Sequence, residues 1–476
     1  MLEQKLYDYA KSDYYPFHMP GHKRQLDCRW NPYEMDITEI DGFDNLHHAQ
    51  EILKQSQKRA AKLYGARKSY YLVNGSTCGL LAAICAATGK GDRILVARNC
   101  HKALYHAMYI RDLVPTYIYP HEDNVLGING GISPARVERA LEENPEIEAV
   151  FITSPTYDGV VSDVRRIADA AHKHGVPLIV DEAHGAHFRF SEYFPRSAAN
   201  MGADLVIHSV HKTLPSMTQT AVLHRCTDMV DRDLLKRFLG IYQTSSPSYI
   251  LMASIDACMD KLERDGRQMF EAFTGNLEEA RKRLEKCRYI RLVTPKPSRE
   301  MRIYNFDRSK ILLSTEYSSL NGRQLHEILN KEFHLEMEMD GEAYVLALTS
   351  VGDTKEGLSR LCDAIEEIDR REAEKQEKKT EESDENKKLC PIGGMKQMMR
   401  ISEAMEAPAV SCPIEETIGK VSAEFAYIYP PGIPLIVPGE QITGLFVRNV
   451  RRYMEQGLEL QGLCDESNQT IKVVKE

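Results

Sequence analysis

The chain has 476 residues, of which 42% are hydrophobic and 28% charged, and its formal net charge is -9. This balance is typical of globular proteins, and the net negative charge argues against a general nucleic-acid-binding surface, which needs clustered Lys and Arg. No apolar run reaches the roughly 20 residues that span a bilayer, and residues 1–10 lack the apolar core of a secretory signal. We therefore expect a cytoplasmic protein with no nucleic-acid or membrane partner, whose charge would attract cationic substrates weakly.

Helical patterns alternate with short apolar runs between residues 51 and 223. Helices are expected at 51–64, 76–88, 101–112, 134–143 and 164–174, and strands at 70–73, 93–97, 116–119, 149–153, 177–180 and 205–208. Alternation at this spacing predicts a mainly parallel sheet covered by helices.

A second, smaller α/β unit is expected beyond residues 254–287, a stretch rich in helix formers. Strands are expected at 290–293, 311–314 and within 335–348, and helices at 321–332, 356–367 and 440–455. Residues 370–388 are almost wholly charged or polar and of mixed sign, which is typical of a solvated or disordered insertion. We therefore predict a large domain over residues 1–270, and a linker helix and small C-terminal domain over residues 271–476.

A turn between an expected strand and an expected helix reads Asn74-Gly75-Ser76-Thr77. Glycine lets the backbone approach a ligand closely, and the N-terminus of the following helix presents unpaired N–H groups to an anion. Ser76 and Thr77 add hydroxyl donors. The turn favours a phosphate site, although Ser and Thr are also common helix N-caps.

Two further residues follow expected strands. Asp181 ends one strand, where a carboxylate points into the crevice in which α/β folds bind ligands. Lys212, in Ser209-Val210-His211-Lys212-Thr213, can reach the same crevice and form a Schiff base. A lysine about thirty residues after such an aspartate, and downstream of a phosphate-type turn, indicates a pyridoxal-phosphate site in which the aspartate keeps the pyridine nitrogen protonated.

Several motifs extend this pattern along nearly the whole chain. They are Phe17-His18-Met19-Pro20-Gly21-His22-Lys23, Asn74 to Gly79, Ser154-Pro155-Thr156-Tyr157, Asp181-Glu182-Ala183-His184-Gly185, His208 to Thr213, Gln243-Thr244-Ser245-Ser246-Pro247-Ser248 and Tyr429-Pro430-Pro431-Gly432-Ile433-Pro434. Jointly they resemble the Orn/Lys/Arg decarboxylase family. The resemblance implies the fold-type I architecture of the aspartate aminotransferase superfamily, with a large, mainly parallel sheet domain and a smaller C-terminal α/β domain. It is to the short form of the family, without the N-terminal receiver-like wing domain of the long enzymes.

The resemblance implies roles around the pyridine ring of pyridoxal 5'-phosphate. Lys212 would form the Schiff base, and Asp181 would pair with the pyridine nitrogen. His101 would stack on the ring, and His184 would lie beside the cofactor. For these two histidines the alternative is an ordinary core or surface position.

The resemblance also implies a phosphate site shared between subunits. Ser76 and Thr77 would bind the phosphate, helped by Ser209 and His211. Hydroxyls from 244–246 of the neighbouring subunit would complete it. A homodimer or a higher homo-oligomer is therefore expected.

Two other interpretations of these motifs are weaker. Asp181-Glu182-Ala183-His184 spells a helicase box, but no Gly-x4-Gly-Lys-Ser/Thr loop occurs upstream. The pairs His184 and His187, or His208 and His211, suggest metal ligation. However, no His-Glu-x-x-His occurs, and no carboxylate or cysteine is spaced to complete a closed site. We expect no metal.

The expected activity is decarboxylation of a basic amino acid. The substrate amine displaces Lys212 from the cofactor, and after carbon dioxide leaves, His211 or Lys212 returns a proton to Cα. Arginine, giving agmatine for polyamine biosynthesis, is preferred over lysine and ornithine because of the short-form resemblance. The distal cation needs an acidic pocket, for which Glu424 and Glu440 are candidates, although Glu440 could instead favour a helix N-terminus.

The sequence leaves two other functions open. An aminotransferase would retain Lys212 and Asp181 but normally clamps the substrate α-carboxylate with an arginine. A non-catalytic regulator on the same scaffold would be expected to lack the lysine or the aspartate, and both are present.

Overall fold

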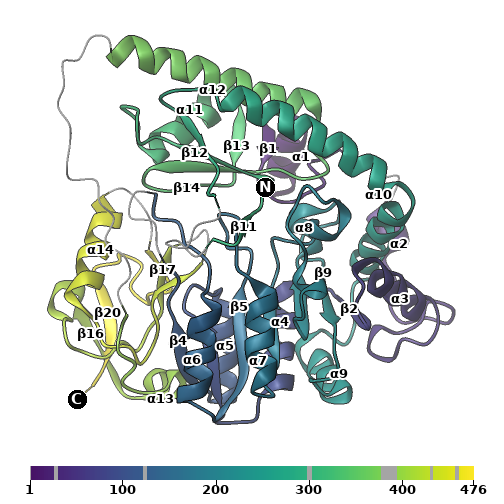
Figure 1. Ribbon diagram of the computed structural model, residues 1–476, viewed down its shortest axis with the longest axis vertical. Helices are drawn as coiled ribbons and strands as arrows, with labels where there is room; N and C mark the ends of the chain where they lie inside the picture. Colours follow the sequence, from purple (N-terminus) through teal and green to yellow (C-terminus); the bar gives the residue numbers. More distant parts are fainter. Residues whose placement is uncertain are drawn as a thin grey trace.

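The computed structural model describes residues 2–25, 31–121, 126–296, 303–376, 394–428, 432–455 and 460–475. Figure 1 shows a large domain in blue and teal, a smaller one in green above it, and a C-terminal unit in yellow beside the large domain. A long helix, α10 (Tyr249–Leu284), leads from the large domain to the smaller one.

The large domain is built on a seven-stranded sheet with the order β2-β9-β8-β7-β5-β3-β4. Its strands are β2 (Lys68–Leu72), β3 (Arg93–Ala97), β4 (Val114–Ile118), β5 (Ile147–Thr153), β7 (Leu178–Asp181), β8 (Leu205–His208) and β9 (Ala221–Arg225). Neighbours are parallel except where β9 pairs with β2 and β8, so the expected mainly parallel sheet is confirmed. Strand β9 was not predicted.

Helices pack on this sheet in two groups. Helix α4 (Gly75–Ala87) is apolar almost throughout and is therefore buried between the sheet, α5 (Lys102–Arg111) and α9 (Arg232–Tyr242). The amphipathic helices α6 (Pro134–Glu143) and α7 (Val164–Lys173) pack against each other. The main apolar core of the large domain lies between these helices and the sheet.

The smaller domain is built on an antiparallel sheet of four strands, in the order β10-β12-β15-β14. These are β10 (Arg291–Val293), β12 (Lys310–Ser314), β14 (Met339–Asp340) and β15 (Tyr344–Leu348), with helices α11 (Gly322–Phe333) and α12 (Lys355–Gln376). A second apolar core joins these elements to α10 and to α3 (Ile52–Tyr64). The proposed division after residue 270 stays a prediction; that residue lies inside α10.

The N-terminal segment crosses to the smaller domain. Strand β1 (Tyr15–Phe17) pairs in parallel with β13 (Leu335–Met337), and α1 (Leu2–Lys11) precedes it. Tyr15 is buried there, and its hydroxyl donates to Asp353 at 3.0 Å. The first residues of the chain therefore help to hold the smaller domain.

The C-terminal unit has its own apolar core. It contains α13 (Ile401–Glu406), β16 (Ala409–Pro413), β17 (Ala426–Ile428), β18 (Pro434–Ile436), α14 (Gly444–Glu455), β19 (Leu460–Gln461) and β20 (Thr470–Val474). Strand β16 pairs with β20, and β17 lies between β18 and β19. The expected closing helix therefore begins at Gly444, later than residue 440, and these strands were not predicted.

The expected insertion at 370–388 is partly wrong. Helix α12 continues to Gln376, beyond the expected end at residue 367. Its exposed face carries ion pairs one turn apart, including Arg371 with Glu367 at 2.9 Å and Arg370 with Glu367 at 2.8 Å. Such pairs support helical structure in the last turns of α12, which are made almost wholly of charged residues. Residues 377–388 lie outside the described part of the chain.

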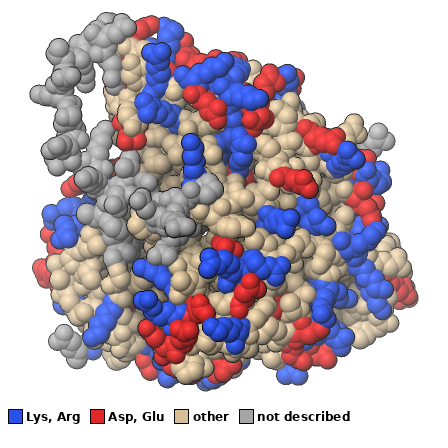
Figure 2. All heavy atoms as spheres, viewed as in Figure 1, with Lys and Arg blue, Asp and Glu red and all other residues tan. Residues whose placement is uncertain are grey.

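The surface carries both signs of charge close together. On the face in Figure 2, acidic and basic side chains are interspersed, in keeping with surface ion pairs such as Arg264 with Asp260. Within the described ranges, no helix is both long enough and apolar enough to cross a membrane.

Candidate active site

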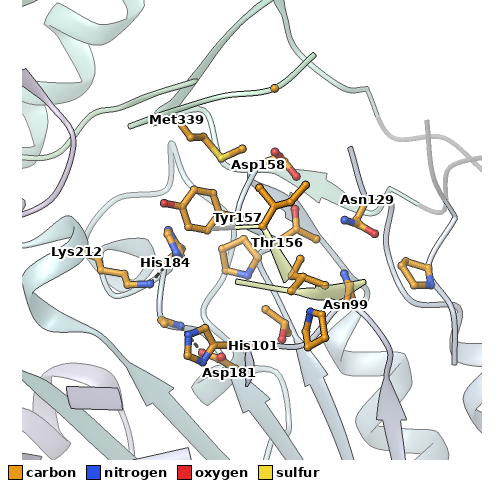
Figure 3. Close-up of a pocket in the computed structure, with 18 of the residues that line it drawn as sticks. Asn99, His101, Asn129, Thr156, Tyr157, Asp158, Asp181, His184, Lys212 and Met339 are labelled. Atoms are coloured by element: carbon orange, nitrogen blue, oxygen red, sulfur yellow. Dashed lines mark hydrogen bonds between the residues drawn. The ribbon is translucent and has the colours of Figure 1, made fainter. Parts of the chain in front are cut away.

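A cavity of about 550 Å³ lies at the carboxyl ends of the large-sheet strands. It is lined by residues that directly follow β3, β4, β5 and β8, by the last residue of β7, by 339–342 and Tyr344 of the smaller domain, and by 428, 433–435 and 453 of the C-terminal unit. The eight residues expected from the sequence to bind the cofactor within one subunit or to act in catalysis all line it: Ser76, Thr77, His101, Asp181, His184, Ser209, His211 and Lys212. The cavity is therefore assembled from three parts of the chain, and Figure 3 shows its central side chains.

Lys212 lies in the loop between two adjacent strands. Strand β8 ends at His208, and the short helix α8 (Val210–Thr213) then carries Lys212 to the cavity before the chain returns as β9. Its Nζ lies 2.9 Å from Nε2 of His184, as the dashed line in Figure 3 marks. Burial lowers the pKa of Lys212, while Asp181 opposes the shift. The lysine is thus disposed toward its neutral, nucleophilic form.

Asp181 is the last residue of β7 and is buried. Its Oδ1 accepts a hydrogen bond from the backbone N–H of Ala183 at 3.1 Å. Burial raises the pKa of Asp181, while the nearby Lys212 lowers it. A buried carboxylate in this position can pair with a cationic ring nitrogen in the cavity.

His101 caps the N-terminus of α5. Its Nδ1 accepts from the backbone N–H of Ala103 at 3.2 Å, which fixes the ring. Burial lowers the pKa of His101 to about 3, and Lys212 adds to the shift. Figure 3 shows His101 next to Asp181. It offers an uncharged aromatic face to a planar ligand.

The expected phosphate turn begins α4. Gly75 has φ 71°, and its N–H donates to the carbonyl of Gln219 at 3.0 Å. Ser76 Oγ lies 2.6 Å from Ser209 Oγ, which brings together two hydroxyls from turns far apart in the sequence. Thr77 is exposed at the cavity wall. The helix N-terminus and these hydroxyls form a donor set suited to a phosphate.

His211 and Asn99 also lie on the wall of the cavity, where pyridoxal 5'-phosphate would bind. His211 Nδ1 donates to the carbonyl of Thr220 at 2.8 Å, and burial lowers the pKa of His211 to about 4. The Oδ1 atom of Asn99 is buried on the cavity wall with no hydrogen-bond partner in the described part of the chain. An anion-binding turn, a buried carboxylate, a neutral aromatic ring and a desolvated lysine match the groups of this cofactor. The residues present therefore fit it.

The segment expected to serve a neighbouring subunit lies apart from this cavity. Thr244, Ser245 and Ser246 are exposed in the single chain. The carbonyl of Thr244 accepts from Nε2 of His47 at 2.8 Å. Their exposure leaves the hydroxyls accessible to a second subunit, and their role stays a prediction. Tyr429 to Pro431, of the last sequence motif, lie outside the described residues.

Glu424 and Glu440, the sequence candidates for the substrate's distal cation, do not line the cavity. Glu440 is paired with Arg98, with Nε to Oε1 at 3.0 Å and Nη2 to Oε2 at 2.9 Å. Glu424 accepts the backbone N–H groups of Cys464 at 2.8 Å and Lys472 at 3.0 Å. Both carboxylates are therefore engaged in holding the C-terminal unit together or to the large domain.

The structure gives contacts at the site to residues that had no role assigned from the sequence. Lys310 of β12 places Nζ 2.9 Å from Nδ1 of His184, and burial lowers the pKa of Lys310 to about 8. Tyr157 donates its hydroxyl to Glu338, and the Tyr157 ring packs 4.6 Å from the His184 ring between centroids. Asp158 accepts from the Tyr344 hydroxyl at 2.8 Å.

Only some of these residues could have been found from the sequence. Asp158 directly follows the recognised motif ending at Tyr157, so its position was accessible from the sequence. Lys310 and Glu338 reach the site from the smaller domain, and no motif marked them. Among the described residues, no three His, Cys, Asp or Glu side chains are grouped so as to hold a metal ion.

Comparison with known proteins identifies the family. Residues 2–314 match the Orn/Lys/Arg decarboxylase major domain, and residues 387–463 match the C-terminal domain of the same family. An arginine decarboxylase of Bacillus subtilis (strain 168) is 33% identical, covering 97% of this chain and 94% of its own length. An arginine decarboxylase of Bacillus anthracis is 30% identical, covering 99% of this chain and 96% of its own length.

The fold is shared with a solved decarboxylase. The lysine decarboxylase of Francisella novicida superposes with a TM-score of 0.80 at 20% sequence identity, covering 100% of this chain and 81% of that one. The expected fold-type I architecture, with a large, mainly parallel sheet and a C-terminal domain, is thereby confirmed. The family domains match most of the chain, and its relatives align with it over nearly their whole length. The chain therefore belongs to the Orn/Lys/Arg decarboxylase family.

Proposed function

We propose that this chain converts L-arginine to agmatine and carbon dioxide with pyridoxal 5'-phosphate bound at Lys212. The observation that carries the proposal is the meeting of Lys212, His184 and Asp181 at one cavity, with a phosphate-type turn on the same wall. Family membership supports the reaction class. Arginine is favoured because the relatives at 33% and 30% identity are named arginine decarboxylases.

Each group of the cofactor has a counterpart in the chain. Gly75, Ser76 and Ser209 would hold the phosphate, Asp181 the pyridine nitrogen, and Lys212 the aldehyde carbon. When bound, pyridoxal 5'-phosphate supplies an electron sink for the electron pair left on Cα when carbon dioxide departs. Asp181, buried and acting through charge, favours the protonated ring nitrogen that makes this sink effective. His101 covers the ring with an uncharged face.

The protein groups also manage the protons. Lys212 is drawn toward the neutral amine by burial, and that is the nucleophilic form of a lysine. A proton returns to Cα from Lys212 or from His211, which lie on the same wall. The Nδ1 proton of His211 is committed to the Thr220 carbonyl, so Nε2 of the neutral ring carries a lone pair, and His211 can give a proton to Cα only after Nε2 has first taken one up.

Asp158 on the cavity wall is proposed to bind the distal cation of the substrate, and Glu338, which accepts from the Tyr157 hydroxyl and does not itself line the cavity, to attract it by charge. Asp158 lies on the cavity wall, and Figure 3 shows it away from Asp181, on the side nearer Met339. Glu338 raises the pKa of both Lys212 and Lys310, which locates its charge next to the site. A guanidinium beside Asp158 would gain a charge-assisted hydrogen bond. Lysine and ornithine are the alternative substrates, with a shorter-reaching ammonium.

The proposal extends to a cytoplasmic homodimer that acts in polyamine biosynthesis. The exposed hydroxyls at 244–246 support a shared site, because a partner could reach them. Mixing Lys212→Ala protein with a T244A/S245A/S246A variant tests this. In a shared-site dimer, random subunit exchange makes half of the dimers mixed, and each mixed dimer has one intact site, so about a quarter of native activity should return. If the sites are not shared, the mixture should be no more active than the triple variant that it contains.

A transaminase function is the second candidate, and one observation counts against it. Of the described residues that line the cavity, only Arg98 is an arginine, and Glu440 engages its guanidinium. Arg98 is therefore not available to clamp a substrate α-carboxylate. A regulator without catalytic activity is disfavoured because Lys212 and Asp181 both line the cavity.

The testing experiment incubates the protein and pyridoxal 5'-phosphate with arginine, lysine and ornithine in turn. Carbon dioxide and the amine product are measured, with Lys212→Ala as the inactive variant and Lys173→Ala, on an exposed helix face, as the matched control. Agmatine and carbon dioxide from arginine alone are expected. Cadaverine or putrescine as main product would reassign the substrate, and a pyridoxamine form without carbon dioxide would favour the transaminase.

A further inference from the structure

His184 lies between two lysines from different domains. Its Nε2 is 2.9 Å from Nζ of Lys212, and its Nδ1 is 2.9 Å from Nζ of Lys310. Lys212 belongs to α8 of the large domain, and Lys310 is the first residue of β12 in the smaller domain. The imidazole is buried, and the Lys310 side chain is fully enclosed. One ring therefore links the two amines.

The protonation states of Lys212, His184 and Lys310 depend on one another. Burial lowers the pKa of His184 well below its usual range, and both lysines push it further, so the ring is neutral. A neutral imidazole has one N–H and one lone pair. Two ammonium groups cannot both donate to it. One lysine must be a neutral amine that accepts the ring N–H.

The surrounding charges favour Lys310 as the ammonium. Asp307, Glu338 and Asp158 each raise its pKa against the effect of burial, and the result is about 8. The Tyr157 ring also lies beneath it, with 5.7 Å from Nζ to the centroid, which favours a cation. Glu338 also raises the pKa of Lys212, but the other carboxylate that raises it is Asp181, which would pair with the cofactor nitrogen.

We propose that Lys310 is a positioning residue that acts through His184 to hold Lys212 as the neutral amine. Lys310 donates to Nδ1, so the ring carries its proton on Nε2. That N–H donates to the lone pair of Lys212. The catalytic lysine is thereby kept ready to attack a carbonyl or imine carbon. The catalytic meaning of this arrangement rests on the proposed function, but the hydrogen-bond pattern depends only on these three side chains.

The remaining titratable groups do not compete for this proton. The groups whose charges act on the pKa values of the three side chains are His101, His211, Asp158, Asp181, Asp307 and Glu338, and the Tyr157 ring packs against His184 and Lys310. Burial lowers the pKa values of His101 and His211 to about 3 and about 4, so both are neutral at neutral pH. Oδ1 of Asp307 accepts from the Ser309 hydroxyl at 2.7 Å and contacts His187 Nε2 at 3.2 Å, which fixes its charge near Lys310.

The test measures the ionisation of Lys212 in cofactor-free protein. Acetylation of Lys212 by acetic anhydride is followed across pH by peptide mass spectrometry, with the exposed Lys173 as internal reference. Lys310→Met removes the ammonium, and Lys310→Arg keeps it. We expect native Lys212 to react at neutral pH as a largely neutral amine. Lys310→Met should slow its labelling about 10-fold, the effect of one pKa unit, and Lys310→Arg should restore it.

Two results would overturn the inference. One is a native Lys212 that titrates like Lys173, and the other is a Lys310→Met protein whose Lys212 titrates as in the native protein. A second measurement needs no change at Lys310: ring-nitrogen resonances of ¹⁵N-histidine protein, with His184→Gln used for assignment. The proton is expected on Nε2 of His184, and a proton on Nδ1 would contradict the proposal.

These readouts separate the inference from the proposed function. Labelling and tautomer are measured without cofactor or substrate, so they report on Lys310 even if no amino acid is decarboxylated. Failure to bind pyridoxal 5'-phosphate or to release carbon dioxide would instead refute the proposed function. A role of Lys310 in folding alone would change stability without moving the labelling pH profile.

Discussion

Arg98 and Glu440 form a bidentate ion pair in which the two side chains are 4% and 0% exposed. The guanidinium also donates to the carbonyl of Pro434 at 2.8 Å. Arg98 directly follows β3, and Glu440 belongs to the C-terminal unit. The pair therefore fastens that unit to the large sheet beside the cavity.

Removing one partner of this pair should destabilise the protein strongly. Arg98→Met leaves the Glu440 carboxylate buried without its cation, and breaking a buried pair costs about 3–5 kcal/mol. Urea unfolding measures the loss. The double variant R98M/E440M should recover part of it, because no uncompensated charge remains. A single-variant loss below about 1 kcal/mol, the value of a surface pair, would contradict the assignment.

Asp181→Asn should impair the chemical step with little effect on the fold. The amide cannot hold a pyridine nitrogen in its protonated form, and losing a preorganised electrostatic partner costs on the order of 100-fold or more in kcat. Steady-state decarboxylation measures the effect. Asp169→Asn, on the exposed face of α7, is the matched control and should keep native activity. Equal losses in the two variants would remove Asp181 from the mechanism.

Asp158→Asn and Glu338→Gln should each raise KM for arginine more than they lower kcat. Asp158 is proposed to bind the distal guanidinium directly, and a lost charged hydrogen bond costs about 1.5–3 kcal/mol. Glu338 is proposed to act through its charge, so Glu338→Gln should have the smaller effect. Glu342 lines the cavity and forms an ion pair with Arg452, so Glu342→Gln provides a comparison. A fall in kcat with unchanged KM would argue against a role in substrate binding.

Acid should destabilise the protein partly through His101. The folded-state pKa is about 3 and the ordinary value is 6.5, so the unfolded chain binds the proton first as pH falls. Stability contributed by the neutral ring is complete above pH 6.5 and decreases toward pH 3, by about 1.4 kcal/mol per pH unit for one such group.

The His101 contribution is isolated by difference, because the buried carboxyl of Asp181 has a raised pKa and titrates in the opposite sense. Urea unfolding of native protein and of His101→Gln is compared between pH 7.5 and 5. The native protein should lose more stability over this range. Identical slopes would mean that His101 protonates normally in the folded chain.

Gly75→Ala should weaken cofactor binding and reduce stability. A Cβ added at this position would meet nothing within 4 Å, so the cost arises from φ 71° and not from a clash. A left-handed conformation costs a residue other than glycine about 1–2 kcal/mol. Gly275→Ala is the control, since it lies inside α10 with open space around it and should be neutral or stabilising. Titration with pyridoxal 5'-phosphate and urea unfolding report both effects.

Those site residues that follow a strand directly were accessible from the sequence. Parallel strands end at one edge, so Asp181 at the end of β7 and Lys212 shortly after β8 had to meet there. Lys310 and Glu338 were not accessible, because they contact the cavity residues His184 and Tyr157 only when the smaller domain docks. Glu440 was misjudged for the same reason: its partner, Arg98, lies 342 residues away.

Some elements of the fold were likewise predictable from the sequence and others were not. Strand β3 and helix α6 were predicted with the bounds that they have, since each is a clear periodic run between turn signals. Helix α9 was missed although Asp231 caps it and its pattern is amphipathic. Strands β16 and β20 were missed because each is short and pairs with a distant partner, and pairing of that kind leaves little local signal.

Part of the cavity wall comes from residues 433–435 and Tyr453, near the end of the sequence. During synthesis the large sheet, with Lys212 and Asp181 at its edge, emerges from the ribosome well before these residues do. The residues proposed to bind the cofactor are therefore synthesised before the wall that closes the cavity on this side. In the order of translation, the enclosure of the substrate comes last.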